Sequence, residues 1–244
     1  MNLYLLRVGA DSTHYSRIFP DGSYIFIPIP DEEKYLVKEK ARTYREYTWR
    51  NHPVCEYLPD RIQNRCIHND PEFETFTYGS PRYNRNGSVE KNYRKLAAMQ
   101  EGDMLTFYAA FTSNGHEIEG YYFFAYFIVD RPITVPDNLT DEEKELVENN
   151  HHFIHIGALQ NQEQVIVKGC PKQSRLFRKA VLLSSHKHGI EGRNYRPCRC
   201  VQNLLGGYNK SMNRSSIRKI PLSADGICEF KNHLDKKGGR LQDA

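Results

Sequence analysis

Hydrophobic residues along the chain form short runs bounded by turn-forming residues. Residues 1–8 are mostly apolar and end at Gly9, so they predict a short buried strand that reaches Arg7. Two further apolar runs, residues 165–167 and 177–183, flank a Gly-Cys-Pro turn and predict two more strands.

Aromatic residues are concentrated in two neighbouring segments, residues 103–111 and 120–130. The polar link between them contains Asn114-Gly115, a dipeptide that favours tight turns. We therefore predict a β-hairpin, whose aromatic side chains belong mainly to the core. Tyr108 has small neighbours on its strand and is our candidate to line a pocket.

Three segments have the pattern of helices. Residues 31–50 are charged helix formers with a stripe of Tyr35, Leu36, Tyr44 and Tyr47 and predict the first. The second is expected from a Ser88 N-cap to about Gln100, with Gly102 as its stop. In the third, Thr140 and Glu143 form a capping box at the head of a helix that ends near Asn149.

The remaining segments lack a clear period. Residues 51–87 carry many turn formers, so we expect a long structured loop of the kind that is often functional. Residues 206–219 and 235–244 are expected to be mobile. Because strands outnumber helices and the hairpin is antiparallel, an α+β class is favoured over a doubly wound sheet.

The length of 244 residues suits one large domain with at most a small addition. We predict a single α+β domain over residues 1–185 and a basic extension over residues 186–244, packed on the domain or partly mobile. No apolar run approaches the roughly 20 residues that a membrane span needs, and the N-terminus lacks a signal pattern. We expect a cytoplasmic protein without membrane association and with free thiols at its six cysteines.

Positive charge is concentrated in the last third of the chain. Residues 1–160 contain 17 Lys and Arg against 24 Asp and Glu, whereas residues 161–244 contain 17 against 6. Such a basic segment is typical of phosphate neutralisation in nucleic-acid binding, with Lys168 and Arg175 among the candidate substrate-binding cations. A solvated basic face is the alternative.

Two local clusters could carry chemistry. The first joins Arg7, which could bind a phosphate, to Asp11 as a base and Ser12 as a hydroxyl donor; an Arg–Asp pair with a capped turn is the alternative. The second joins His68, Asp70 and Glu72, which could perform acid–base catalysis. We assign no metal site, because no ligand set of known spacing accompanies them.

Residues 151–155 contain three histidines. On a strand His151, Phe153 and His155 would share one face and His152 would lie on the other. A proton shuttle or metal site is one interpretation of this group, and ordinary hydrogen bonding is the other. Glycine-rich phosphate loops, a nucleophile elbow and the deaminase signature are all absent from the sequence.

Several separated motifs together resemble the nucleotide modification associated domain 3 family. They are residues 7–12, Pro28-Ile29-Pro30, residues 68–72 and residues 102–111, in this order and spacing. The resemblance implies base modification in nucleic acid, with Arg7, Asp11, Ser12, His68, Asp70 and Glu72 around one pocket. Gly102-Asp103 before an aromatic strand is also similar to PUA-like domains of the EVE and ASCH groups, which implies a mainly antiparallel sheet or a partly open barrel with peripheral helices.

Three functions remain open at this stage. An enzyme of transferase or glycosylase type would use Arg7 for phosphate and Asp11 or Asp70 for acid–base chemistry. A non-catalytic module would stack a base on Tyr108 and hold the backbone through the basic third. A metal-dependent nuclease has the least support. Nucleic acid or a nucleotide is the expected partner in each case, and the sequence points to no particular cofactor or oligomeric state.

Overall fold

A computed structural model describes residues 1–9, 15–31, 36–84, 86–113, 119–136, 139–158, 162–185, 195–213 and 216–239. The chain forms two compact units. Unit 1 comprises Met1–Ile27, Asp103–Tyr126 and Arg175–Ala244, and unit 2 comprises Pro28–Gly102 and Phe127–Ser174. The predicted boundary at residue 185 therefore does not coincide with a boundary between units.

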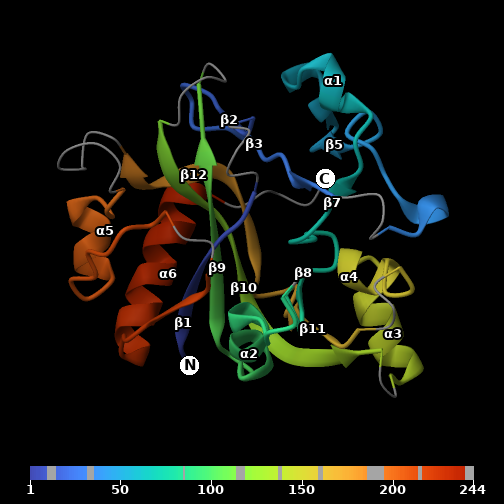
Figure 1. Cartoon of the computed structure of the whole chain (residues 1–244). Helices are drawn as coiled ribbons and strands as arrows, with labels where there is room; N and C mark the ends of the chain where they lie inside the picture. Colours follow the sequence, from blue (N-terminus) through green and yellow to red (C-terminus); the bar gives the residue numbers. More distant parts are fainter. Residues whose placement is uncertain are drawn as a thin grey trace. The chain divides into compact units, whose positions relative to one another are not determined.

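Unit 1 is built on strands that are neighbours in space but distant in sequence (Figure 1). Strand β1 (Leu3–Arg7) runs parallel to β9 (Met104–Phe111) and antiparallel to β13 (Arg218–Ile220). Strand β9 lies beside β10 (Gly120–Val135), and residues 120–126 of β10 pair with β12 (Arg175–Ser185) in antiparallel register. A short ribbon, β2 (Arg17–Ile18) with β3 (Tyr24–Ile25), completes the strands described in this unit.

The apolar runs of the sequence form strands in both units. Every residue of β1 is buried, as expected for a strand paired on both sides. Strands β9 and β10 are neighbours joined only by residues 112–119, which confirms the hairpin; Asn114 and Gly115 lie outside the described residues. Strands β11 (Gln164–Gly169) and β12 confirm the other two strand predictions.

The C-terminal part of the chain contributes ordered elements to unit 1. Helix α5 (Arg199–Leu204) precedes β13, and helix α6 (Ala224–Gly238) packs against β12 (Figure 1). Ile227, Phe230 and Leu234 are buried at the three- and four-residue spacing of an apolar helix face. The expected mobility of residues 206–219 and 235–244 is thus wrong where β13 and α6 lie, because both elements are held by pairing or packing.

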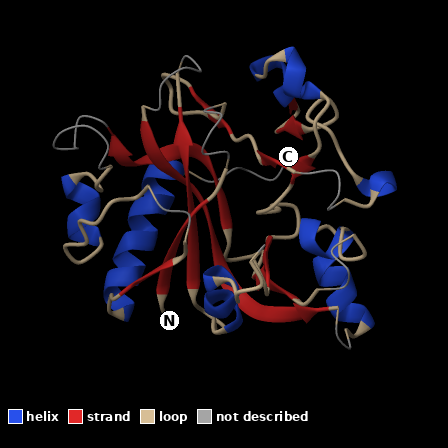
Figure 2. Ribbon diagram, viewed as in Figure 1, coloured by secondary structure: helices blue, strands red, loops and turns tan. Residues whose placement is uncertain are grey.

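Unit 2 consists of short elements joined by long loops (Figure 2). Residues 127–135 of β10 pair with β11, which pairs in turn with β8 (Thr77–Pro81), both in antiparallel register. Two further antiparallel ribbons are β4 (Ile29–Pro30) with β7 (Ile67–His68), and β5 (Thr48–Trp49) with β6 (His52–Pro53). The helices described in this unit are η2 (Lys38–Lys40), η3 (Val54–Tyr57), α1 (Asp60–Gln63), α2 (Lys91–Ala97), α3 (Asp141–Val147) and α4 (His151–Ile154).

One helix start was predicted correctly and another was not. Thr140 caps α3 through the complete capping box with Glu143, and each partner accepts a hydrogen bond from the other's backbone N–H. Helix α2 instead begins after Glu90, which caps it without a side-chain hydrogen bond, so the predicted Ser88 cap is wrong.

The predicted helix over residues 31–50 is also wrong. Only the 3₁₀ turn η2 is helical among its described residues. Tyr44 explains the difference, because its hydroxyl donates to Pro28 O (2.7 Å) and its N–H to Arg65 O (3.1 Å). These tertiary bonds outweigh the intrinsic helix propensity of the segment.

Residues 151–154 form the helix α4, so the strand geometry considered for the histidines does not apply. The Asn150 side chain accepts a hydrogen bond from His152 N (3.0 Å) and so starts the helix. His151 and His155 then lie four residues apart along one helical face. The helix thus places the His151 and His155 rings edge to face, with centroids 4.5 Å apart.

The fold class is mixed α and β with a mainly antiparallel sheet, as predicted. No sheet closes into a barrel in the part of the chain that the structure describes. All six cysteines carry free thiols, which confirms that expectation. Among the described helices, none combines the length and apolar character that a bilayer crossing requires.

Candidate functional site

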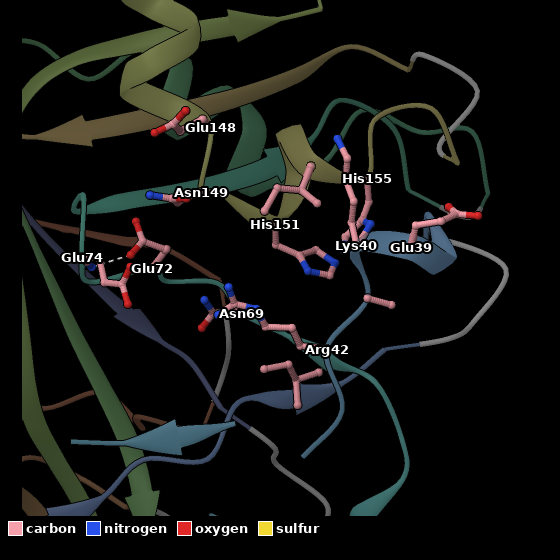
Figure 3. Close-up of a pocket in the computed structure, with 13 residues that line it drawn as sticks. Glu39, Lys40, Arg42, Asn69, Glu72, Glu74, Glu148, Asn149, His151 and His155 are labelled. Carbon is pink, nitrogen blue, oxygen red and sulfur yellow. Dashed lines mark hydrogen bonds between the residues drawn. The ribbon is translucent and has the colours of Figure 1, made fainter. Parts of the chain in front are cut away.

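Unit 2 contains a cavity of about 430 Å³ beside helix α4 (Figure 3). Its lining mixes carboxylates, cations, amides and imidazoles. The polar lining residues are Glu39, Lys40, Arg42, Asn69, Glu72, Glu74, Glu148, Asn149, His151 and His155. Figure 3 shows Glu72 and Glu74 on one side of the cavity and Lys40 and His155 on the other.

Helix α4 brings two imidazoles to the cavity. The rings of His151 and His155 are edge to face, with centroids 4.5 Å apart. The Nδ1 atom of His155 accepts a hydrogen bond from Val37 N (3.0 Å). Burial lowers the pKa of His155 to about 4, so this ring is neutral at physiological pH and can serve as an acceptor.

Asp31 links the imidazole of His68 to that of His151, and His151 lines the cavity. Its Oδ2 atom lies 2.9 Å from His68 Nδ1 and 2.7 Å from His151 Nε2. Burial, helped by the nearby His68, lowers the pKa of His151 to about 2. Burial opposes ionisation of Asp31, but its hydrogen bonds with His151 and His68 outweigh that effect and hold the pKa of the carboxyl well below its ordinary value.

A second carboxylate–imidazole pair lies deeper in unit 2. Asp70 accepts hydrogen bonds from Gly79 N to both oxygens (3.1 Å each) and from Asn150 Nδ2 (3.1 Å). His152 Nε2 is 3.4 Å from Asp70 Oδ2, and the two side chains are 7% and 2% exposed. A Cβ on Gly79 would stand 2.4 Å from the His152 ring, so only glycine permits this close approach.

Glu72 lines the cavity but is itself buried. Its carboxylate accepts hydrogen bonds from Glu74 N and from Thr75 N (3.0 Å). Burial raises the pKa of Glu72. Lys168, predicted to bind substrate, is buried nearby with its ammonium donating to Thr75 O, and it is not among the lining residues.

The other predicted site residues lie in unit 1 or outside the description. Arg7 Nη1 donates to Asn213 O, and the guanidinium stands 4.6 Å from the centre of the Tyr121 ring. Tyr108 is 0% exposed, and its hydroxyl donates to Met212 O (3.0 Å). Arg175 is half-buried on β12. Asp11 and Ser12 lie outside the described residues.

The structure therefore gathers His68, Asp70 and Glu72 within unit 2. It adds three residues that the sequence did not single out, namely Asp31, Lys40 and Arg42. Asp31 directly follows the Pro28-Ile29-Pro30 motif, which was the one local signal for it. Its assignment to a predicted helix concealed its pairing with His68.

A family model described as nucleotide modification associated domain 3 matches residues 2–222. The chain belongs to this family. Membership in the nucleotide modification associated domain 3 family confirms the resemblance drawn from the motifs. The matched residues include β13 as well as the predicted domain. A comparison with curated protein sequences gave no match.

Two solved structures are similar to this member of the family over nearly their whole length. The DUF55 domain of human thymocyte nuclear protein 1 is 16% identical, with 96% of this chain and 98% of that chain covered and a TM-score of 0.30. The N-terminal domain of Thermococcus gammatolerans McrB, bound to m5C DNA, is 8% identical, with 97% and 99% covered and a TM-score of 0.30. At these TM-scores, neither similarity contributes to the functional argument.

Proposed function

We propose that the protein is an enzyme that modifies the base or sugar of a nucleotide held in the unit 2 cavity. Two findings support this: membership in a nucleotide modification associated family and a cavity of about 430 Å³, a volume typical of ligand sites. The observation that carries the proposal is the placement of cations and a buried carboxylate around that one cavity (Figure 3).

Lys40 and Arg42 are the phosphate-binding residues in this proposal. Both line the cavity and both are exposed. An arginine fork can bind two phosphate oxygens at once, and a lysine ammonium adds a point charge. We transfer the phosphate role here from Arg7, whose guanidinium already bonds to Asn213 O within unit 1.

Glu72 is the proposed acid–base group. Its raised pKa brings the carboxyl closer to the range in which it can both release and accept a proton near neutral pH. Asp70 is less suited, because it does not line the cavity and its side chain is only 2% exposed. The amides of Asn69 and Asn149 can donate to and accept from a base edge.

The binding part of the proposal is tested by calorimetry with the four common nucleoside monophosphates. Arg42→Gln should weaken binding by about 10-fold or more, since a charge-assisted phosphate contact contributes roughly 1.5–3 kcal/mol. Arg61→Gln is the matched control, because Arg61 is an exposed cation of unit 2 that does not line the cavity. Equal losses in both variants, or no binding by the wild type, would refute the proposal.

The catalytic part is tested with Glu72→Gln. Cells that express the wild type should contain modified nucleosides detectable by mass spectrometry, and cells that express Glu72→Gln should lack them. Retained nucleotide binding by the variant shows that its cavity is intact. If cells that express the wild type, cells that express Glu72→Gln and cells without the protein all have the same nucleoside profile, catalysis by Glu72 is excluded.

A non-catalytic nucleic-acid module is the second candidate. It is favoured by cations that stand exposed on the elements of unit 1, namely Arg178, Lys179, Arg199, Lys219, Lys236 and Lys237. Binding through them would depend steeply on salt and would not require Arg42. Oligonucleotide affinity measured between 50 and 200 mM salt for wild type, Arg42→Gln and Arg178→Gln/Lys179→Gln separates the two candidates.

A further inference from the structure

We infer that Asp31, His68 and His151 form a binding site for one divalent transition-metal cation of the zinc type. One of the three ligands, His151, lines the unit 2 cavity. The inference deepens the proposed function: a catalytic role for the cation rests on that function, whereas its binding does not.

Three separate segments of unit 2 converge on the site. In the β4–β7 ribbon Ile29 pairs with His68, which places Asp31 next to the His68 side chain. His151 is the first residue of α4, and the Asn150 cap fixes where that helix begins. The convergence therefore follows from two local structures, a β-ribbon and a capped helix.

The ligand atoms are already close to coordination distance from a common point. All three lie within 4.8 Å of one another, and Asp31 Oδ2 is 2.9 and 2.7 Å from the two imidazole nitrogens. Tetrahedral zinc with bonds of about 2.0–2.1 Å separates its ligand atoms by about 3.3 Å. Widening the two Asp31 distances by roughly half an ångström would match this separation.

The ligand types select a class of metal. Two imidazoles and one carboxylate form the ligand set of many catalytic zinc sites and of non-haem iron sites. Magnesium and calcium prefer oxygen ligands alone and fit this set poorly. The tautomers with the N–H on His68 Nε2 and His151 Nδ1 would leave His68 Nδ1 and His151 Nε2 as the two nitrogens that bind the cation.

The position of the triad leaves room for a fourth ligand. His151 lines the cavity (Figure 3), and the side chains of His68 and Asp31 are 19% and 14% exposed. Three protein ligands with one side toward a cavity are typical of catalytic rather than structural zinc. A water molecule or a substrate oxygen would complete the coordination.

A second group of possible ligands lies beside the triad. His68, Asp70 and His152 form a second group of possible ligands that shares His68 with the first. His152 Nδ1 is buried without a hydrogen-bond partner among the described residues. Asp70 already accepts hydrogen bonds from Gly79 and Asn150, and the side chains of Asp70 and His152 are only 2% and 7% exposed, so we place the cation at Asp31.

The test uses the full chain, freed of metal with EDTA and titrated with Zn²⁺ in a calorimeter. We expect one Zn²⁺ per chain, with no competition from Mg²⁺ at equal concentration. His68→Gln and His151→Gln should each weaken Zn²⁺ binding by about 100-fold. Loss of a residue that only hydrogen-bonds to a metal ligand can already cost up to about 100-fold, and these two residues are ligands. With Co²⁺ as probe, the visible absorption bands of a bound ion should appear in wild type and be lost in both variants.

Two control variants keep the result specific. His155→Gln removes an adjacent cavity imidazole that lies outside the triad, and it should change Zn²⁺ affinity by no more than about 10-fold. Cys200→Ser tests for binding by the neighbouring thiols of Cys198 and Cys200, whose sulfurs are 3.2 Å apart. Thermal unfolding of each variant shows whether it is folded, and Asp31→Asn provides a third ligand variant if a histidine variant is not.

The outcomes are distinct from those of the proposed function. Absence of Zn²⁺ binding in the wild type, or binding lost only in Cys200→Ser, overturns the metal site. Binding lost in His68→Gln and His151→Gln but kept in Glu72→Gln supports it. If nucleoside modification is absent while this pattern holds, the proposed enzyme function fails and the metal site stands.

Discussion

The two units treat their buried polar side chains differently. In unit 1 three such groups bond to backbone carbonyls. The Tyr24 hydroxyl donates to Phe177 O (2.7 Å), that of Tyr108 to Met212 O (3.0 Å), and Arg7 to Asn213 O. In unit 2 the side chains of Asp31, His68 and His151 bond to one another beside a cavity.

This difference indicates what each group can do. A hydroxyl or guanidinium that bonds to a backbone carbonyl stabilises the fold, and its release exposes an unsatisfied buried acceptor. Side chains that bond to one another beside a cavity can exchange those bonds for bonds to a ligand without disturbing the backbone. Substitution of a closed group, one that bonds to the backbone away from the cavity, should therefore mainly reduce fold stability. Substitution of an open group, one that bonds to other side chains beside the cavity, should mainly reduce ligand binding.

The largest expected effect concerns Asp70, the closed carboxylate of unit 2. Asp70→Ala removes the acceptor of Gly79 N and of Asn150 Nδ2 and the carboxylate that faces the His152 ring, and each buried polar group left unsatisfied costs about 1–3 kcal/mol. Asp31→Ala is the matched variant and should cost less, because water from the cavity can replace the carboxylate. Urea unfolding followed by the fluorescence of Trp49, the single tryptophan, measures both. An equal or larger loss in Asp31→Ala would contradict the distinction.

A smaller effect is expected for Tyr108 in unit 1. Tyr108→Phe removes the hydrogen bonds to Met212 O and Arg218 and should reduce the free energy of unfolding by about 1–3 kcal/mol. Nucleotide affinity should stay unchanged. The exposed Tyr83 provides the control, since Tyr83→Phe should alter neither quantity. Loss of nucleotide binding in Tyr108→Phe would restore the Tyr108 hydroxyl as a candidate nucleotide contact.

Lys168 provides a pH-dependent test. It is a cation of unit 2, but like Arg7 in unit 1 it bonds to a backbone carbonyl. Its ammonium bonds to Thr75 O, and burial lowers its pKa from the ordinary 10.5. A lowered folded pKa means that stability is gained as pH rises through that pKa toward 10.5 and is lost as pH falls. The gain is at most about 1.4 kcal/mol per pH unit.

Comparison with Lys168→Met isolates this contribution. The difference in unfolding free energy between wild type and variant, measured at pH 8 and pH 10, cancels the titration of other groups. The wild type should gain relative to the variant as pH rises. A constant difference would show that the pKa of Lys168 is the same in the folded and unfolded states.

Local signals explain what could be predicted from the sequence. The buried run of β1, the aromatic hairpin and the Thr140–Glu143 capping box each depend on a few adjacent residues, and all three are present. The helix over residues 31–50 failed because hydrogen bonds of Tyr44 to distant carbonyls decide that segment. Helix propensity carries no information about such contacts.

The candidate site was predictable only in part for the same reason. His68, Asp70 and Glu72 stood out because they are close together in sequence. Asp31 lies 37 positions from His68 and 120 from His151, and no local pattern connects the three. Their meeting depends on the β4–β7 register and on the start of α4, which only the folded chain reveals.

The smallest expected effect concerns charge at the cavity and tests whether its ligand is an anion. Glu74 is exposed and lines the cavity, and its carboxylate would repel a bound phosphate. Glu74→Gln should therefore raise nucleoside monophosphate affinity by a factor of about 2–5, the size of one exposed charge interaction of up to about 1 kcal/mol. Glu101→Gln removes an exposed carboxylate that does not line the cavity and should change the affinity little. The gain should shrink at high salt, where exposed charges are screened. Unchanged or weaker affinity in Glu74→Gln would mean that the bound phosphate does not lie on the Glu74 side of the cavity.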